Sequence, residues 1–257
     1  MMQRFSGHYF ALSLFIFSFG QAQAEACSAQ SRPNIVPLLE LYTSEGCSSC
    51  PPADQWLSQL DTQSAQVTPL AFHVDYWNYI GWQDRFSKPQ YSNRQRQLAK
   101  LNGAGFVYTP QFVLNGRDFK GWNSQRLGEA ASRFHQQPAK LQLELKTVAE
   151  ANGDIQLNAI ASAQDIFTAN RAEIYIALFE NKLVSNIKAG ENNGRELHHD
   201  YVVRDMFGGF SMPQQVSWQK RMRIPRVWQQ RDGGAVMFVQ DKLTGEVLQS
   251  LALRFCH

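Results

Sequence analysis

The sequence lacks a hydrophobic run long enough for a lasting membrane span. The apolar stretch Phe10–Phe19 is about half the ~20 residues that a transmembrane helix needs. Arg4 precedes this stretch and Ala22-Gln23-Ala24 follows it, which is the pattern of a secretory signal peptide with a small-residue cleavage site. We therefore predict a signal peptide over residues 1–24 and a periplasmic or secreted protein without stable membrane insertion after cleavage. An uncleaved N-terminal anchor is the alternative.

The sequence also lacks a strong charge of either sign. The formal net charge is +3, and it falls to +2 when Arg4 leaves with the signal peptide. No basic stripe with interleaved aromatic residues is present, so we expect no nucleic-acid partner. No internal repeat is visible, and no motif implies an organic cofactor. Removing the first 24 of the 257 residues leaves 233, which fits one large domain or two small ones.

Cysteine is scarce, with four residues in the chain: Cys27, Cys47, Cys50 and Cys256. Export implies an oxidising compartment, in which disulfides persist. The close spacing of Cys47 and Cys50 favours a bond between them, which leaves Cys27 near the mature N-terminus and Cys256 one residue from the end. We predict that Cys27 and Cys256 form a structural disulfide that joins the termini. On the chain-entropy model such a bond contributes up to ~5 kcal/mol of stability.

The stretch 38–60 combines a strand pattern, a tight turn, the two close cysteines and a helix pattern. The N-terminus of a helix carries unpaired N–H groups and a partial positive charge, which stabilise a thiolate and lower the pKa of the thiol. Pro51 and Pro52 are compatible with the first turn of this helix. With Cys47 at the helix edge and Cys50 one turn inside, we predict an exposed attacking thiol at Cys47 and a resolving thiol at Cys50.

The rest of the first half alternates strand and helix signals. Strands are predicted at 36–42 and 68–75 with a helix at 52–60 between them, so the two strands should be parallel in a βαβ unit. A helix at 89–101, a strand that ends at the Asn115-Gly116 turn, a hairpin partner at 119–122 and a helix at 124–135 follow. From Pro138 on, six short strand signals suggest a β-sandwich. They lie near 141–145, 155–159, 173–180, 216–224, 235–241 and 246–255.

The motif around the two close cysteines resembles the thioredoxin superfamily. The C-x-x-C motif follows a strand, opens a helix, and is followed about sixty residues later by Thr109-Pro110 at the entry to a strand. In that superfamily a cis-proline in this position packs against the dithiol and exposes backbone to an extended substrate. The resemblance implies that Thr109 and Pro110 shape a peptide groove. It implies an α/β thioredoxin-like domain over 33–137, to which a mostly-β, sandwich-like domain over 138–257 is appended.

A narrower resemblance is carried by three stretches: residues 40–54 (ELYTSEGCSSCPPAD), 73–77 and 190–192. They resemble an uncharacterised family of secreted bacterial thioredoxin-like proteins with an EGCSSCPPAD motif. Because the substrate of that family is not established, the resemblance implies a fold and a site rather than a reaction. The segment 190–194 is, in the first place, typical of a turn.

The sequence departs from thioredoxin in two places. The pair between the cysteines is Ser48-Ser49, and this pair tunes redox potential, so the direction of electron flow stays open. The position of thioredoxin's buried aspartate is occupied by Leu41. The neighbouring Glu40 is a candidate for proton transfer to Cys50, with a solvent-facing glutamate as the alternative, and Asp75 is the rival candidate.

These observations favour an exported thiol–disulfide oxidoreductase that acts on protein or small-molecule disulfides, with protein thiols and disulfides of the periplasm as partners. A binding or assembly module with an inert Cys47–Cys50 bridge is one alternative. A copper metallochaperone that combines the thiolates with His73 is another. The pair His198-His199 is interpreted as surface histidines. The aromatic loop 76–82 either lines a cleft beside the dithiol or caps the sheet.

Overall fold

The computed structural model describes residues 26–150, 152–225 and 227–256. The predicted signal peptide therefore lies outside the described residues. Within them the fold is mixed α/β and mostly β, with strands arranged in three sheets. Among the described helices, none combines the length and the apolar character that crossing a membrane requires.

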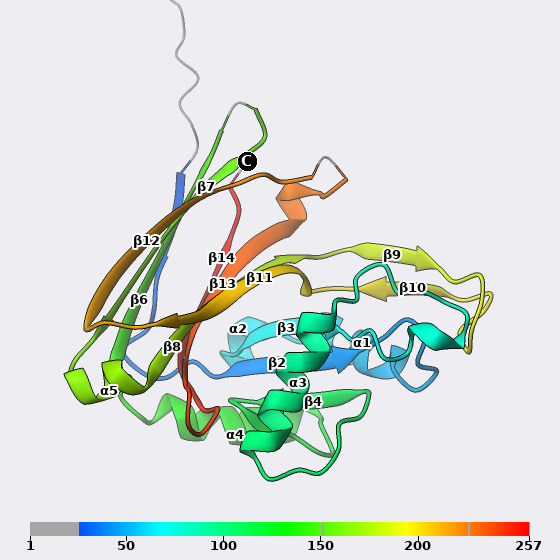
Figure 1. Ribbon diagram of the computed structural model, residues 1–257, viewed down its shortest axis with the longest axis horizontal. Helices are drawn as coiled ribbons and strands as arrows, with labels where there is room; N and C mark the ends of the chain where they lie inside the picture. Colours follow the sequence, from blue (N-terminus) through cyan, green and yellow to red (C-terminus); the bar gives the residue numbers. More distant parts are fainter. Residues whose placement is uncertain (1–25, 151, 226, 257) are drawn as a thin grey trace, which may run out of the picture.

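One mixed sheet of eight strands runs through both halves of the chain, in the order β14-β13-β8-β11-β3-β2-β4-β5 (Figure 1). The pair β2–β3 is parallel, as predicted, and so is the pair β3–β11, whereas the other neighbours are antiparallel. The segments 33–137 and 138–257 thus share one sheet. Its strands are β2 (Leu38–Thr43), β3 (Thr68–His73), β4 (Gln111–Leu114), β5 (Arg117–Asp118), β8 (Ala172–Glu180), β11 (Val202–Ser211), β13 (Gly233–Asp241) and β14 (Val247–Arg254).

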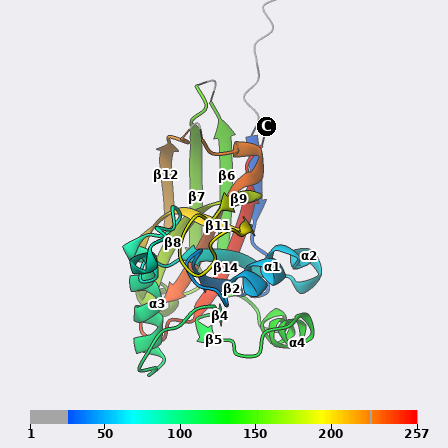
Figure 2. The same cartoon turned by 90° about the vertical axis from the view of Figure 1, so that its right-hand side faces the viewer.

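Helices cover both faces of this sheet at the end that carries β2 and β4 (Figure 2). Because side chains alternate along a strand, β2 contributes residues to two hydrophobic cores on opposite faces of the sheet. Leu39 and Leu41 pack with α1 (Pro51–Ser58) and α4 (Ser124–His135). Leu38 and Tyr42 pack on the opposite face with α3 (Pro89–Leu101). The short helix α2 (Thr62–Ala65) and a 3-10 turn, Asn78–Ile80, lie in the connections.

A second, antiparallel sheet has the order β1-β6-β7-β12. Its strands are β1 (Ala26–Gln30), β6 (Leu141–Ala149), β7 (Ile155–Ala163) and β12 (Gln215–Met222). Alternate residues of β6 and β7 are buried, and they share a hydrophobic core with β8, β13 and β14. The two sheets therefore form two packed layers, with the helix α5 (Ile166–Arg171) and the 3-10 turn Gln230–Asp232 in connections.

The structure contains a disulfide between Cys27 and Cys256, with 5.7 Å between the two Cα atoms. Cys27 lies in β1 and Cys256 follows β14. The bond therefore links an edge strand of the four-stranded sheet to an edge strand of the eight-stranded sheet.

The third sheet is a hairpin of β9 (Leu183–Asn186) and β10 (Glu196–His199). The segment 187–195 connects these strands, and we call it the covering loop. Figure 1 shows the hairpin reaching past the large sheet, over the end of β2 at which α1 begins. The sequence pattern did not predict β9, β10 or β11, and β10 contributes a side chain to the candidate site.

Candidate functional site

The Cys47–Cys50 disulfide lies at the N-terminus of α1, as the sequence predicts. β2 ends at Thr43, residues 44–49 turn the chain, and Cys50 occupies the N-cap position of the helix. Two prolines open the helix, and their missing N–H groups cost no hydrogen bond there. The two Cα atoms are 5.4 Å apart. A sulfur released from this bond would lie at the positive end of the α1 helix dipole.

Both cysteines are buried, and the expectation of an exposed Cys47 is wrong for this oxidised structure. Cys47 and Cys50 are each 0% exposed, whereas the intervening Ser48 and Ser49 are exposed. The Sγ atom of Cys47 lies 3.3 Å from the Oγ atom of Ser49. Access to the disulfide therefore requires movement of whatever covers it.

The covering loop lies over Cys47 and is held by polar contacts. The Nδ2 atom of Asn192 donates to the backbone oxygens of Glu45, at 2.8 Å, and of Cys47, at 3.0 Å. The backbone N–H of Ser48 donates to the Oε2 atom of Glu191 at 3.0 Å. Hydrogen bonds from Ser48 hold the pKa of Glu191 below its usual range. The segment 190–192, singled out by the resemblance, thus contacts the dithiol motif directly.

The aromatic loop 76–82 forms the neighbouring wall. A Cβ atom added at Gly46 would lie 3.3 Å from Cβ of Trp77 and 3.2 Å from Cδ1 of Ile80, so the glycine permits this close packing. A Cβ atom added at Gly190 would meet Trp82 at 3.3 Å. The aromatic loop therefore packs beside Cys47 and also supports the covering loop.

The Thr109-Pro110 loop lies at the same edge of the sheet. The peptide bond between these residues is cis. Pro110 directly precedes β4, in which Gln111 pairs with Tyr42 near the end of β2. The indole Nε1 atom of Trp77 donates to Oγ1 of Thr109 at 2.7 Å, which joins this loop to the wall beside Cys47.

The Glu40 side chain points neither toward the dithiol nor toward solvent. It is 0% exposed and forms a bidentate pair with Arg94 of α3, at 2.7 and 2.8 Å, while the Tyr42 hydroxyl donates to it at 2.8 Å. α3 covers the face of the sheet opposite α1, so Glu40 points away from Cys50. Alternation along β2 explains this difference from the expectation.

Asp75, the rival candidate for proton transfer, is engaged with α3. The hydroxyl of Ser92 donates to Oδ1 of Asp75 in a short hydrogen bond, and the backbone N–H of Asp75 donates to the same hydroxyl at 3.1 Å. Asp75 is half-buried just beyond the end of β3. This geometry gives it a role in attaching α3 to the sheet.

A group of buried polar side chains lies beside the dithiol motif, and sequence reasoning did not assemble it. We call it the buried polar cluster; its members are Glu45, Asp54, His73, Asp84 and His199, each at most 6% exposed. The first two flank the disulfide in sequence, His73 ends β3, Asp84 follows the aromatic loop, and His199 ends β10.

Glu45 and Asp54 each have one carboxylate oxygen held by a donor. Trp82 Nε1 donates to Glu45 Oε2 at 2.7 Å, and Thr43 Oγ1 donates to Asp54 Oδ2 at 3.0 Å. The other oxygens face the ring of His199. Its Nε2 atom is 3.7 Å from Glu45 Oε1, and its Nδ1 atom is 3.8 Å from Asp54 Oδ1, which is too long for hydrogen bonds.

His73 has a closer partner. Its Nδ1 atom lies 2.6 Å from Oδ2 of Asp84, and its ring packs edge-to-face against His199 at 4.9 Å between centroids. Burial opposes protonation of His73, but the charge and hydrogen bond of Asp84 outweigh it and raise the pKa of the imidazole. Burial would raise the pKa of Asp84, yet His73 lowers it. Asp84 thus occupies Nδ1 of His73, and the two cysteine sulfurs are bonded to each other, so this oxidised state offers no thiolates for the predicted copper set.

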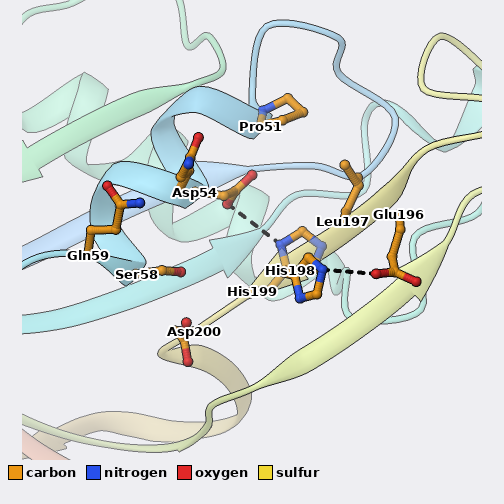
Figure 3. Close-up of a pocket in the computed structure, with 10 residues that line it drawn as sticks. Pro51, Asp54, Ser58, Gln59, Glu196, Leu197, His198, His199 and Asp200 are labelled. Atoms are coloured by element: carbon orange, nitrogen blue, oxygen red, sulfur yellow. Dashed lines mark hydrogen bonds and ion pairs between the residues drawn. The ribbon is translucent and has the colours of Figure 1, made fainter.

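A pocket of about 370 Å³ reaches the cluster between α1 and β10 (Figure 3). Asp54 and His199 line its inner side, while His198 points outward to Glu196, 3.1 Å away. The interpretation of both histidines as surface residues is therefore wrong for His199, which is 2% exposed. The two neighbours do point to opposite faces, and one of those faces is the buried site.

A match to a protein-family model identifies the family of this chain. The model described as "Protein of unknown function (DUF1223)" matches residues 38–240, which is more than half of the chain. The chain belongs to the DUF1223 family. The match includes the C-x-x-C motif, the aromatic loop, the covering loop and all five members of the buried polar cluster. A search of curated proteins found no significant match for this DUF1223 protein.

Two solved structures are similar to this DUF1223 protein. Protein AGR_C_4864 from Agrobacterium tumefaciens aligns with a TM-score of 0.62 and 24% identity, over 87% of this chain and 96% of that one. HBP35 of Porphyromonas gingivalis aligns with a TM-score of 0.62 and 15% identity, over 88% of this chain and 76% of that one. At these identities the similarity shows the fold alone.

One sequence signal could have located His199. Along β10 the burial alternates, with Leu197 and His199 inward and Glu196 and His198 outward. If a strand is assumed here, the apolar Leu197 indicates the buried face, and His199, two positions later, lies on the same face. The strand is only four residues long, which is why the pattern alone did not reveal it.

Proposed function

We propose that this DUF1223 protein is an exported thiol–disulfide oxidoreductase whose Cys47–Cys50 disulfide exchanges with protein thiols in the periplasm or outside the cell. The observation that carries the proposal is a disulfide at the start of α1, which places the released sulfurs where amide dipoles stabilise an anion. The signal-peptide pattern and the second disulfide, Cys27–Cys256, agree with an exported protein.

The exchange begins with a partner thiolate that attacks Sγ of Cys47. The bond between Cys47 and Cys50 breaks, a mixed disulfide forms, and Cys50 leaves as a thiolate. A second partner thiol then attacks the partner sulfur of the mixed disulfide, which releases the partner as a disulfide and Cys47 as a thiolate. Two electrons pass from the partner dithiol to this protein, and each cysteine thiolate is protonated from solvent as its pKa dictates. The reverse sequence reduces a partner, with Cys50 as the resolving thiol.

Exchange requires opening of the covering loop. Three hydrogen bonds join Glu191 and Asn192 to residues 45–48: Asn192 donates two, and Glu191 accepts one. Polar contacts of this kind contribute about 1 kcal/mol each, so a partially open state is accessible without global unfolding. We assign Thr109, Pro110 and Trp77 to the wall of the groove that then receives the partner chain.

A trapping experiment tests the proposal. The Cys50→Ala variant should accumulate mixed disulfides through Cys47 with exported proteins or model peptides, because no resolving thiol releases them. The Cys47→Ala variant is the matched control and should accumulate far less. Equal yields from both variants, or none from either, would sink the redox proposal.

A noncatalytic binding or assembly module is the second candidate, and the complete burial of both cysteines favours it. In that case the disulfide is a structural bond. It should resist a reductant until the protein unfolds, and a Cys47→Ser/Cys50→Ser double variant should retain whatever partner binding the protein has.

A further inference from the structure

We propose that the buried polar cluster is a binding site for one divalent transition-metal ion, held by His73, His199 and Asp54, with the Glu45 carboxylate close by. One potential ligand atom from each of Asp54, His73 and His199 lies within 4.8 Å of the others. All three side chains are buried. The site is separate from the cysteine sulfurs and does not depend on the proposed redox function.

Unpaired polar atoms point to a missing occupant. His73 Nε2, both ring nitrogens of His199 and Glu45 Oε1 are buried and have no hydrogen-bond partner. A buried polar atom without a partner costs about 1–3 kcal/mol, so four in one place require an explanation. One ion can bind Nε2 of His73 and one ring nitrogen of His199, and its positive charge would also stabilise the neighbouring Glu45 carboxylate.

The surroundings of His73 match those of a metal ligand. Its Nδ1 atom contacts Asp84 at 2.6 Å, which leaves Nε2 as the free nitrogen. Histidines that bind metals commonly donate their other ring N–H to a carboxylate, which fixes the tautomer and the ring orientation. Asp84 is itself held by the backbone N–H groups of Glu45 and Phe86, each at 2.9 Å, so the pair is rigid.

The charge balance also favours a cation. Glu45, Asp54 and Asp84 bring three carboxylates into one buried region. Throughout the part of the chain that the structure describes, these three carboxylates form ion pairs with histidine alone. Buried carboxylates without full compensation are costly, and a divalent ion supplies the positive charge that the side chains lack.

The donor set selects the class of ion. Two imidazole nitrogens with one or two carboxylate oxygens suit Zn²⁺ and neighbouring first-row divalent ions, whereas Mg²⁺ and Ca²⁺ prefer oxygen alone. The pocket between α1 and β10 provides an entry path, since Asp54 and His199 line it.

Zinc titration of the untagged mature protein tests the site. The protein is kept oxidised, stripped with a chelator and titrated with ZnCl₂ by calorimetry, and metal content is measured separately. We expect one zinc per chain in the wild type. The His199→Ala and Asp54→Asn variants should lose stoichiometric binding, and Asp84→Asn should weaken it 10–100-fold, as expected for loss of an orienting partner.

The neighbouring histidine provides a matched control. His198→Ala removes an exposed imidazole from the same strand and should bind zinc like the wild type. Zinc binding should also persist in Cys47→Ser/Cys50→Ser, which separates this site from the redox proposal. No zinc bound to the wild type, or equal binding by His199→Ala and His198→Ala, would overturn the inference. If circular dichroism shows that His199→Ala does not fold, Asp54→Asn, which keeps the side-chain volume, decides the question.

Discussion

Replacing Asn192 with alanine should make the Cys47–Cys50 disulfide much easier to reduce in the folded protein. Asn192 is fully buried, and its amide donates to the backbone oxygens of Glu45 and Cys47. Each hydrogen bond contributes about 1 kcal/mol net, so removing both lowers the free energy of loop opening by about 2 kcal/mol. Because about 1.4 kcal/mol corresponds to a factor of ten, the open state becomes roughly 30-fold more populated.

The assay measures reduction of the native protein by a water-soluble phosphine. Free thiols are alkylated at intervals and assigned by peptide mass mapping, which separates Cys47–Cys50 from Cys27–Cys256. When the loop closes faster than the phosphine reacts, the rate follows the open population and rises in proportion to phosphine concentration. We expect the Asn192→Ala rate to exceed the wild-type rate by roughly 30-fold.

The exposed neighbour Asn193 provides the matched control, because Asn193→Ala changes the same loop without removing the two hydrogen bonds of Asn192. Its reduction rate should stay close to that of the wild type. If Asn192→Ala and Asn193→Ala are reduced at the same rate while both remain folded, the covering loop does not control access to the disulfide.

Further expectations concern the disulfide at the termini, the buried ion pair and a helix cap. Serine at both Cys27 and Cys256 should lower the free energy of unfolding by about 2–5 kcal/mol in denaturant titration, and an unchanged midpoint would contradict the assigned role of this bond. Arg94→Ala should lower the free energy of unfolding by about 3–5 kcal/mol, because Glu40 is then buried without its ion-pair partner. It should leave phosphine reduction of Cys47–Cys50 in the native state unchanged, whereas a large effect would restore Glu40 as a candidate for proton transfer. Asp165→Ala removes the N-cap side chain of α5 and should lower the free energy of unfolding by about 1 kcal/mol in the same titration. An unchanged free energy of unfolding would mean that solvent replaces this cap fully.

The elements of the first half could be predicted from sequence because their signals are local. The helix predicted at 89–101 and the helix predicted at 124–135 coincide with α3 and α4. The parallel pairing of β2 and β3 follows from the strand–helix–strand order. The hairpin partner predicted at 119–122 forms earlier, as β5 at Arg117–Asp118, because the chain reverses directly at the Asn115-Gly116 turn.

The joining of the two halves could not be predicted, because it depends on pairing between distant residues. β11 docks against β3 through the register pair Val202–Ala71, and no local pattern specifies which edge a strand will choose. The orientation of Glu40 depends on the same long-range arrangement. The alternation along β2 shows that Glu40 and Leu41 face opposite ways, but only the positions of α1 and α3 show which side holds the cysteines.

The dithiol and the buried polar cluster share one moving part, and this links the two proposals. His199 ends β10, and the covering loop leads directly into that strand. If the loop opens by displacing β10, His199 leaves Asp54 and Glu45, so zinc binds the closed state only. Zinc at a hundredfold excess over its dissociation constant should then slow phosphine reduction of Cys47–Cys50 about 100-fold in the wild type. The His199→Ala variant should show no such protection. If the wild-type protein binds zinc but its Cys47–Cys50 disulfide is reduced at the same rate as without zinc, the opening is confined to residues 187–195. That result would refute a shared motion of the loop and β10.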